Sequence, residues 1–171
     1  MMSFLVSQMF PGVLTLIPLY IIIVQWLGLG STRIGLVIVY ATTSVPFSVW
    51  MLKGYFDTIP RELEEAAIIE GAGPGIIFWR IVLPLAMPAI AITALFSFMT
   101  AWNEFILAAT LLSRESAFTL PVVLQRYVGE HDAAWGPFAA GAILVSLPVM
   151  IFFYVAQRQL VSGLTAGGVK G

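Results

Sequence analysis

The sequence has 171 residues, of which 60% are hydrophobic and 10% are charged, and its mean hydropathy is +0.97. Soluble domains carry roughly 25% charged residues, so this composition argues against a soluble globular protein. The formal net charge of −1 and the scattered lysines and arginines offer no basic patch for nucleic acid. Because cysteine is absent, disulfides and thiolate metal sites are excluded.

Four uncharged runs are each long enough to cross a bilayer as a helix, which takes about 20 apolar residues. The runs are continuous rather than alternating, which predicts helices and not the strands of a membrane barrel. The first run lacks the basic start of a signal peptide, so we expect a retained span. The sequence predicts an all-α membrane protein, a polytopic helical bundle with about four transmembrane helices at residues 4–29, 34–52, 84–108 and 134–157.

The long polar connection at residues 53–80 carries 8 of the 17 formal charges, counted as 8 Lys and Arg plus 9 Asp and Glu. If this loop and the tail at 158–171 are cytoplasmic, five lysines and arginines lie inside and three outside. The positive-inside rule favours that orientation by a modest margin. The segment at 113–132 is then expected on the outer side of the membrane.

A short helix is predicted inside this loop, between Asp57 and Gly71. Asp57 or Thr58 can cap it, Pro60 suits its first turn, and Gly71 can end it. Apolar and small residues recur on one face while glutamates occupy the other. A second short helix is expected at 74–80, ending before the next span. By itself the loop is either a projection that docks another protein or a solvated connection.

The motif Glu65-Ala66-Ala67, three residues, Gly71, nine residues, Ile81-Val82-Leu83-Pro84 resembles the EAA motif of binding-protein-dependent ABC transporter permeases. In that family the motif forms a coupling helix that sits in a cleft of the ATP-binding subunit. The resemblance implies a type I ABC importer permease with a cytoplasmic coupling-helix loop. It assigns contact with the ATPase to Glu65, Ala66, Ala67, Gly71, Ile81, Leu83 and Pro84.

Further residues resemble the carbohydrate branch of this family, and within it the maltose-type subunit. They are Lys53-Gly54-Tyr55-Phe56, Trp102-Asn103-Glu104-Phe105 and the C-terminal residues 157–171. The resemblance implies a permease subunit of an ATP-driven importer of maltose or related maltooligosaccharides. Its expected partners are an ABC ATPase dimer, a second permease subunit, an extracytoplasmic sugar-binding protein and the lipid of the inner cell membrane.

The same resemblance assigns roles at both ends of the chain. Contact with the paired ATPases is expected from Gly163, Thr165, Gly167 and Gly168, and contact with the binding protein from Tyr127, Glu130, Asp132 and Trp135. Permeases of this branch have six spans, so we expect this four-span chain to correspond to the C-terminal part of such a subunit. The chain lacks a phosphate-binding loop, and we expect no catalytic residues, metal or cofactor in it.

Glu104 interrupts an otherwise apolar stretch, next to Asn103. An acid within a membrane is costly and suggests a transport path that both residues line. The alternative is that Glu104 lies at the outer interface, paired or solvated. Two other functions stay open on the sequence alone: an ion-coupled secondary carrier, for which Glu104 is the main support, and a non-transporting fragment that only docks partners.

Overall fold

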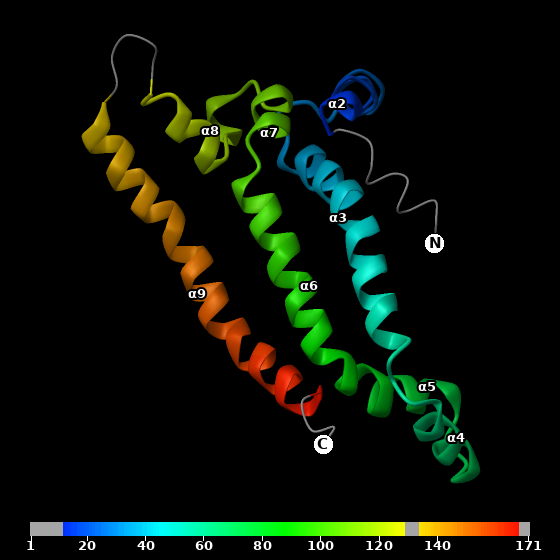
Figure 1. The fold of residues 1–171 in the computed structure, drawn as a ribbon. Coiled ribbons are helices and arrows are strands. Elements are labelled where there is room, and N and C mark those ends of the chain that lie inside the picture. The colour runs from blue at the N-terminus through cyan, green and yellow to red at the C-terminus, as the bar shows by residue number, and fades with distance from the viewer. Residues whose placement is uncertain (1–11, 129–133, 168–171) are drawn as a thin grey trace.

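The computed structural model describes residues 12–128 and 134–167, which form helices and, within these ranges, no β-strand. Three long helices, α3 (Arg33–Phe56), α6 (Leu83–Asn103) and α9 (Trp135–Gly167), extend along the length of the molecule (Figure 1). At one end lie α4 (Arg61–Ile69) and α5 (Pro74–Ile77). At the other, here called the distal end, lie α2 (Gly12–Tyr20), α7 (Ile106–Leu111) and α8 (Leu120–Gln125). The predicted all-α membrane fold is confirmed.

Three helical segments of the described residues are long and apolar enough to cross a membrane, namely Arg33–Phe56, Pro74–Asn103 and Trp135–Gln157. They lie at the second, third and fourth expected spans. The first expected span, at 4–29, is described only in part: Leu14–Trp26 is a shorter apolar helix that combines most of α2 with the π-helix η1 (Ile21–Trp26). Residues 1–11 lie outside the described residues.

The long segment Pro74–Asn103 starts earlier than the sequence suggests. The short helix expected at 74–80 does not end, because α5, the π-helix η2 (Phe78–Val82) and α6 form one continuous helix. A proline disturbs the α-helical bond to the residue four positions back. Directly before Pro84, the amide of Leu83 instead donates to the carbonyl of Phe78, five positions back. This wider π-helical turn lets the chain enter α6 without a break.

The same segment also stops before the expected limit of residue 108. Helix α6 ends at Asn103, and Glu104 has an extended backbone with a ψ of 128°. A new short helix, α7, begins two residues later. The chain therefore turns at Glu104 rather than continuing straight through the apolar residues that follow.

Helix α6 is the centre of the bundle, since it packs against α3 on one side and α9 on the other. Its residues Ala86, Ala89 and Thr93 are buried, and small side chains let neighbouring helices approach closely. Against α9, the indole of Trp102 donates a 3.0 Å hydrogen bond to the carbonyl of Val145. The ring of Phe98 stacks on Trp102 and on Phe152, so aromatic packing joins the two helices.

The main buried cluster lies at the distal end, where α3 and α7 pack together with η1 and α8. Its buried members are Ile23, Leu36, Val39, Ala108, Leu111, Leu112 and Val122. Gly35 permits a close approach there, because a Cβ at that position would lie 2.5 Å from the carbonyl oxygen of Leu29. A buried cluster of the described residues thus holds the distal end together, whereas α4 at the opposite end has few contacts with the other helices.

Candidate functional site

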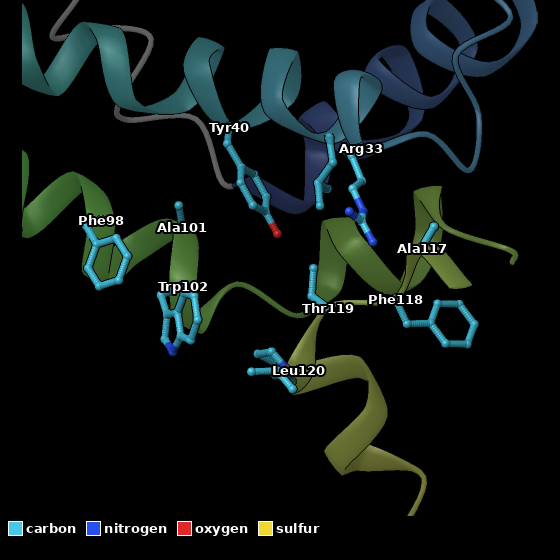
Figure 2. Close-up of a pocket in the computed structure, with 11 residues that line it drawn as sticks. Arg33, Tyr40, Phe98, Ala101, Trp102, Ala117, Phe118, Thr119 and Leu120 are labelled. Carbon is cyan, nitrogen blue, oxygen red and sulfur yellow. The ribbon is translucent and has the colours of Figure 1, made fainter. Parts of the chain in front are cut away.

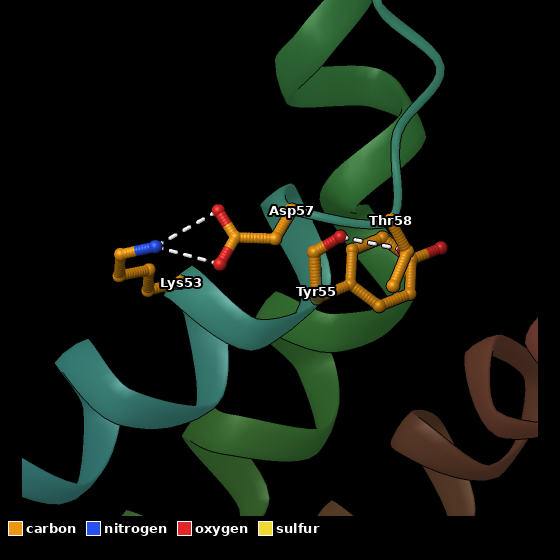
Figure 3. A network of polar contacts seen from close by, with 4 residues as sticks. All are labelled: Lys53, Tyr55, Asp57 and Thr58. Atoms are coloured by element: carbon orange, nitrogen blue, oxygen red, sulfur yellow. Dashed lines mark hydrogen bonds and ion pairs between the residues drawn. The ribbon is translucent and has the colours of Figure 1, made fainter.

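Residues 57–73 form a projection, here called the α4 projection, which extends beyond the ends of α3 and α6 (Figure 1). On the side of α3, the ammonium of Lys53 pairs with both oxygens of Asp57, at 2.6 and 2.9 Å (Figure 3). The hydroxyl of Thr58 donates 2.6 Å to the carbonyl of Tyr55. These side chains therefore complete the last turn of α3.

The predicted cap of α4 was wrong. Neither Asp57 nor Thr58 caps the helix; its N-cap is Pro60, which makes no side-chain capping bond. Asp57 lies one helical turn after Lys53, at the end of α3. Its carboxylate therefore pairs with the Lys53 ammonium rather than capping α4. The amide of Leu63 instead bonds to the carbonyl of Pro60 at 3.3 Å.

Gly71 ends α4, as the sequence predicts. Its φ of +83° is a left-handed conformation that costs a residue with a Cβ about 1–2 kcal/mol. The amide of Gly71 bonds to the carbonyl of Ile68, and the amide of Ala72 bonds to the carbonyl of Ala67, both at 2.9 Å. This pair of bonds is a Schellman motif, which satisfies the carbonyls at the end of the helix.

The outer faces of α4 carry both acids and uncovered apolar side chains. Ala67 is 6% exposed, whereas Ile68 and Ile69 are 61% and 87% exposed. Glu65 and Ala66 are exposed as well. Uncovered isoleucines on a charged projection indicate a surface that contacts another molecule. Between the end of α3 and α4 lies a groove of about 570 Å³, lined by Phe56, Asp57, Ile59, Arg61, Glu64, Glu65 and Ile68.

The predicted coupling residues fall into two groups along the chain. Glu65, Ala66 and Ala67 are on α4 and Gly71 follows it, while Ile81 lies in η2, and Leu83 and Pro84 begin α6. The second part of the motif therefore belongs to the long helix. Because α5, η2 and α6 are continuous, one helix joins the end of the α4 projection to the apolar bundle.

The predicted tail contacts lie toward the same end of the bundle as α4. Gly163, Thr165 and Gly167 belong to the last turns of α9, whose C-terminal end points to that end in Figure 1. Gly168 lies outside the described residues. The structure therefore places the described part of the tail at the end where the α4 projection is found.

Two of the four predicted contacts for a binding protein are described, and both lie at the distal end. Tyr127 and Trp135 are exposed on either side of residues 129–133, and the amide of Ala134 bonds to the carbonyl of Tyr127 at 2.9 Å. Glu130 and Asp132 lie outside the described residues. Nearby, Arg126 pairs with Glu115 and places its guanidinium 4.5 Å from the centre of the Phe118 ring.

The carboxylate of Glu104 is paired with groups of the chain itself. Its carboxylate accepts hydrogen bonds from the Leu107 and Ala108 amides at 2.7 and 3.0 Å, and from the Tyr40 hydroxyl at 3.0 Å. A carboxylate at a helix start satisfies amides that lack partners within the helix. Asn103 is exposed and bonds back to the carbonyl of Met99. The acid therefore has a structural role at the turn into α7.

A cavity of about 440 Å³ at the distal end was not predicted from the sequence. It lies between α3, α6 and the segment before α8, and its lining includes Arg33, Tyr40, Trp102 and Phe118. Figure 2 shows the Tyr40 hydroxyl and the Arg33 guanidinium projecting from α3 toward that segment. The buried Thr119 hydroxyl, also in the lining, has no hydrogen-bond partner among the described residues. These residues are far apart in the chain, so no local pattern marks the cavity.

Comparison with known proteins identifies close relatives. A family model described as the binding-protein-dependent transport system inner membrane component matches residues 1–165. The ORF1 protein of Streptomyces antibioticus, provisionally described as an ABC transporter permease protein, is 46% identical over 165 residues, which are 96% of this chain and 72% of that protein.

Two Escherichia coli K12 proteins are similarly related. The inner membrane ABC transporter permease protein YcjP is 44% identical over 169 residues, covering 99% of this chain and 60% of YcjP. The maltose/maltodextrin transport system permease protein MalG is 42% identical over 173 residues, covering 98% of this chain and 58% of MalG. The chain thus spans about three fifths of the length of these two relatives.

Proposed function

The chain belongs to the binding-protein-dependent transport system inner membrane component family, and we propose that it acts as a permease subunit of an ATP-driven sugar importer. Maltose and related maltooligosaccharides are the proposed cargo, because MalG is among its relatives. The chain itself is a multi-pass membrane protein. It acts with a second permease subunit, an ABC ATPase dimer and an extracytoplasmic sugar-binding protein.

The α4 projection is the observation that carries this proposal. It places Glu65, Ala66 and the uncovered Ile68 and Ile69 on a short helix beyond the ends of the apolar bundle. A small helix with apolar and acidic residues suits a cleft on a partner protein, which would cover the isoleucines. In the proposed orientation this end is cytoplasmic, and the ATPase binds α4 together with the tail at 158–171.

Coupling follows from the way the projection is attached. ATP-driven closure of the ATPases displaces α4, and the continuous helix from Pro74 to Asn103 carries the displacement into the bundle. Helix α6 packs on both α3 and α9, so its movement shifts both neighbours. Alternating access to the two sides of the membrane then results from rocking of packed helices.

The distal end is the outer side in this proposal. The proposed contacts with the sugar-binding protein are Tyr127 and Trp135, which are exposed there, together with Glu130 and Asp132. The alternative of an ion-coupled carrier requires Glu104 as an ion-binding group. The carboxylate of Glu104 instead accepts hydrogen bonds from the Tyr40 hydroxyl and from two backbone amides. No observation on the described residues favours that alternative.

The test uses the complete transporter, with this chain expressed beside its second permease, ATPase and binding protein. Ile69→Glu introduces a charge at the most exposed isoleucine of α4. Leu27→Glu is the matched control, since Leu27 is an exposed apolar residue in the connection before α3, at the distal end. Copurification of the ATPase and uptake of labelled maltose are measured for each.

We expect Ile69→Glu to reduce both ATPase recovery and maltose uptake at least about tenfold, which corresponds to about 1.4 kcal/mol, while Leu27→Glu retains the ATPase. Equal ATPase recovery with both variants would show that α4 is not the docking element. A complex that holds the ATPase and imports another solute but no maltose would contradict the proposed cargo.

A further inference from the structure

The cavity of about 440 Å³ at the distal end, here called the distal cavity, lies where two membrane-crossing segments end. Arg33 is the first residue of the segment Arg33–Phe56, and Trp102 is the last but one of Pro74–Asn103. Both line the cavity. Arginine and tryptophan side chains at the ends of spans lie at the level of the lipid headgroups. Tyr40, also in the lining, is seven residues further along α3 and therefore about 10 Å deeper.

Most of the wall of the distal cavity is apolar. Leu36, Phe98 and Leu120 contribute aliphatic and aromatic surface from three different parts of the chain. The indole N–H of Trp102 is already bonded to the Val145 carbonyl, and the hydroxyl of Tyr40 already donates to Glu104. A solute with many hydroxyl groups would therefore find few free partners on this wall. The volume lies within the roughly 300–1,000 Å³ of small-molecule sites, and the wall suits a hydrocarbon chain.

The charge of the distal cavity comes from Arg33. Its guanidinium projects from α3 toward the segment before α8 (Figure 2). It makes no ion pair with any other described residue, whereas Arg126 at the same end pairs with Glu115. Guanidinium groups bind phosphate through two parallel hydrogen bonds, a geometry that suits a phosphodiester. An arginine at headgroup level beside an apolar wall thus offers a site for an anion that carries a hydrocarbon chain.

A second polar group lies on the opposite wall. The hydroxyl oxygen of Thr119 is buried, lines the cavity and has no hydrogen-bond partner among the described residues. By contrast, the hydroxyl of Thr110 on α7 donates to the Ile106 carbonyl at 2.7 Å. Buried hydroxyls in proteins almost always have a partner. A phosphate oxygen can accept this hydrogen bond, so the same ligand would satisfy both Arg33 and Thr119.

The nearest acid does not oppose an anion there. Glu104 is not among the residues that line the distal cavity. Its carboxylate accepts hydrogen bonds from two backbone amides and from the hydroxyl of Tyr40. Among the described lining residues only Arg33 carries a formal charge, and that charge is positive. Basic pockets between membrane-crossing helices are a known way of holding the headgroups of anionic lipids.

We propose that the distal cavity binds an anionic phospholipid of the phosphatidylglycerol kind. The phosphate contacts Arg33 and the Thr119 hydroxyl, and the first part of one acyl chain lies along Leu36, Phe98 and Trp102. The lipid joins α3, α6 and the segment before α8 at the end of the bundle. The site is independent of the cargo and of the ATPase, and only its assignment to the outer leaflet rests on the proposed orientation of the chain.

The test is photocrosslinking in the complete transporter, reconstituted in bilayer discs of phosphatidylcholine. The discs contain a small fraction of phosphatidylglycerol with a photoreactive group near the glycerol end of one acyl chain. Crosslinked peptides of this chain are mapped and quantified for wild type and for Arg33→Gln. Arg114→Gln is the matched control, because Arg114 is an exposed arginine that also has no ion pair with described residues but does not line the cavity.

We expect the wild-type crosslinks to map to residues 33–40, 98–102 and 117–121. One arginine near a membrane surface contributes enough attraction that Arg33→Gln should reduce this crosslinking at least about fivefold. Arg114→Gln should leave it unchanged, because general attraction of anionic lipid to the distal end is the same in both variants. An equal decrease in the two variants, or crosslinks distributed evenly over the apolar surface of α9, would overturn the proposal.

Competition distinguishes a lipid from other occupants. Unlabelled phosphatidylglycerol should suppress the crosslinks, whereas glycerol phosphate in the buffer should not. Suppression by glycerol phosphate would show a site for a soluble phosphate, and equal suppression by added phosphatidylcholine would show an apolar pocket without selection for charge. Either result contradicts an anionic lipid site. A wild-type complex without crosslinks at these residues does so too, since the cavity is then closed or filled by another subunit.

Two further variants separate the hydroxyl and the space from the charge. Thr119→Val removes the unsatisfied hydroxyl and keeps the shape, with Thr110→Val as the control because the Thr110 hydroxyl is already bonded within its own helix. Ala101→Phe fills the cavity and retains Arg33. We expect Thr119→Val and Ala101→Phe to lower crosslinking and Thr110→Val to leave it unchanged, in complexes that retain the ATPase as wild type does. Full crosslinking in Ala101→Phe would place the lipid outside the distal cavity.

Discussion

The hydroxyl of Tyr40 donates a 3.0 Å hydrogen bond to the carboxylate of Glu104, and this contact joins α3 to the turn between α6 and α7. The same carboxylate accepts the amides of Leu107 and Ala108. One acidic side chain therefore fixes the end of a long helix, the start of a short one and the neighbouring helix. Breaking this network should affect the distal end without altering α4.

Tyr40→Phe removes the hydroxyl and leaves the ring in place. Hydrogen bonds to charged groups contribute about 1.5–3 kcal/mol, so we expect the thermal unfolding midpoint of the purified complex to fall by several degrees. Tyr154→Phe is the control, because Tyr154 is 65% exposed and has no hydrogen bond to other described residues. Equal midpoints for the two variants would show that the Tyr40 bond adds nothing to stability.

Gly71→Ala forces a side chain into a left-handed backbone with a φ of +83°. The cost of about 1–2 kcal/mol should loosen the end of α4, increase protease cleavage within residues 57–73 and reduce ATPase copurification. Gly73→Ala is a close control, since Gly73 has a φ of −75° and open space around its Cα. If both alanines behave alike, the Schellman turn is not what positions α4.

Gly35→Ala should destabilise the distal end. Its Cβ would lie 2.5 Å from the Leu29 carbonyl oxygen, and relief requires a shift of backbone inside the buried cluster at that end. Overpacking of this kind costs about 1–3 kcal/mol. Gly54→Ala on the same helix meets nothing within 4 Å and should be neutral or slightly stabilising. The check is the thermal unfolding midpoint of the complex with Gly35→Ala and of the complex with Gly54→Ala. A midpoint that Gly35→Ala leaves unchanged would contradict the close packing at Gly35.

Lys53→Gln should have little effect on stability despite the 2.6 Å ion pair with Asp57. Both side chains are about half exposed or more, and pairs of this type contribute less than about 0.5 kcal/mol after screening by solvent and salt. The thermal midpoint should stay within about 2 °C of wild type at moderate salt. A larger decrease would mean that this pair holds the base of the α4 projection.

The sequence predicts the parts of this fold that depend on local chemistry. Uncharged runs locate α3, α6 and α9, because length and hydropathy alone select membrane-crossing helices. The stop at Gly71 is also local, since only a residue without a Cβ adopts its backbone conformation cheaply. The EAA motif locates the α4 projection because its residue spacing is a pattern within one segment of the chain.

Expectations that depended on competition between contacts were less accurate. Asp57 or Thr58 was expected to cap α4, but Asp57 pairs with Lys53 one turn earlier and Thr58 bonds to the Tyr55 carbonyl. Helix α6 was expected to continue to 108, but the carboxylate of Glu104 satisfies two amides of α7 and makes the turn favourable. The distal cavity could not be predicted from local patterns, because Arg33, Trp102 and Phe118 in its lining come from separate parts of the chain.

The π-helical turn at Phe78–Val82 has a geometrical consequence for the helix that contains it. A turn closed by bonds to the residue five positions back holds one residue more than an α-helical turn. One extra residue corresponds to about 100° of rotation about the axis. The side chains of α5 therefore point in directions offset by that angle from those an unbroken α-helix would give them. The direction in which the α5 side chains point is therefore set separately from that of the α6 side chains.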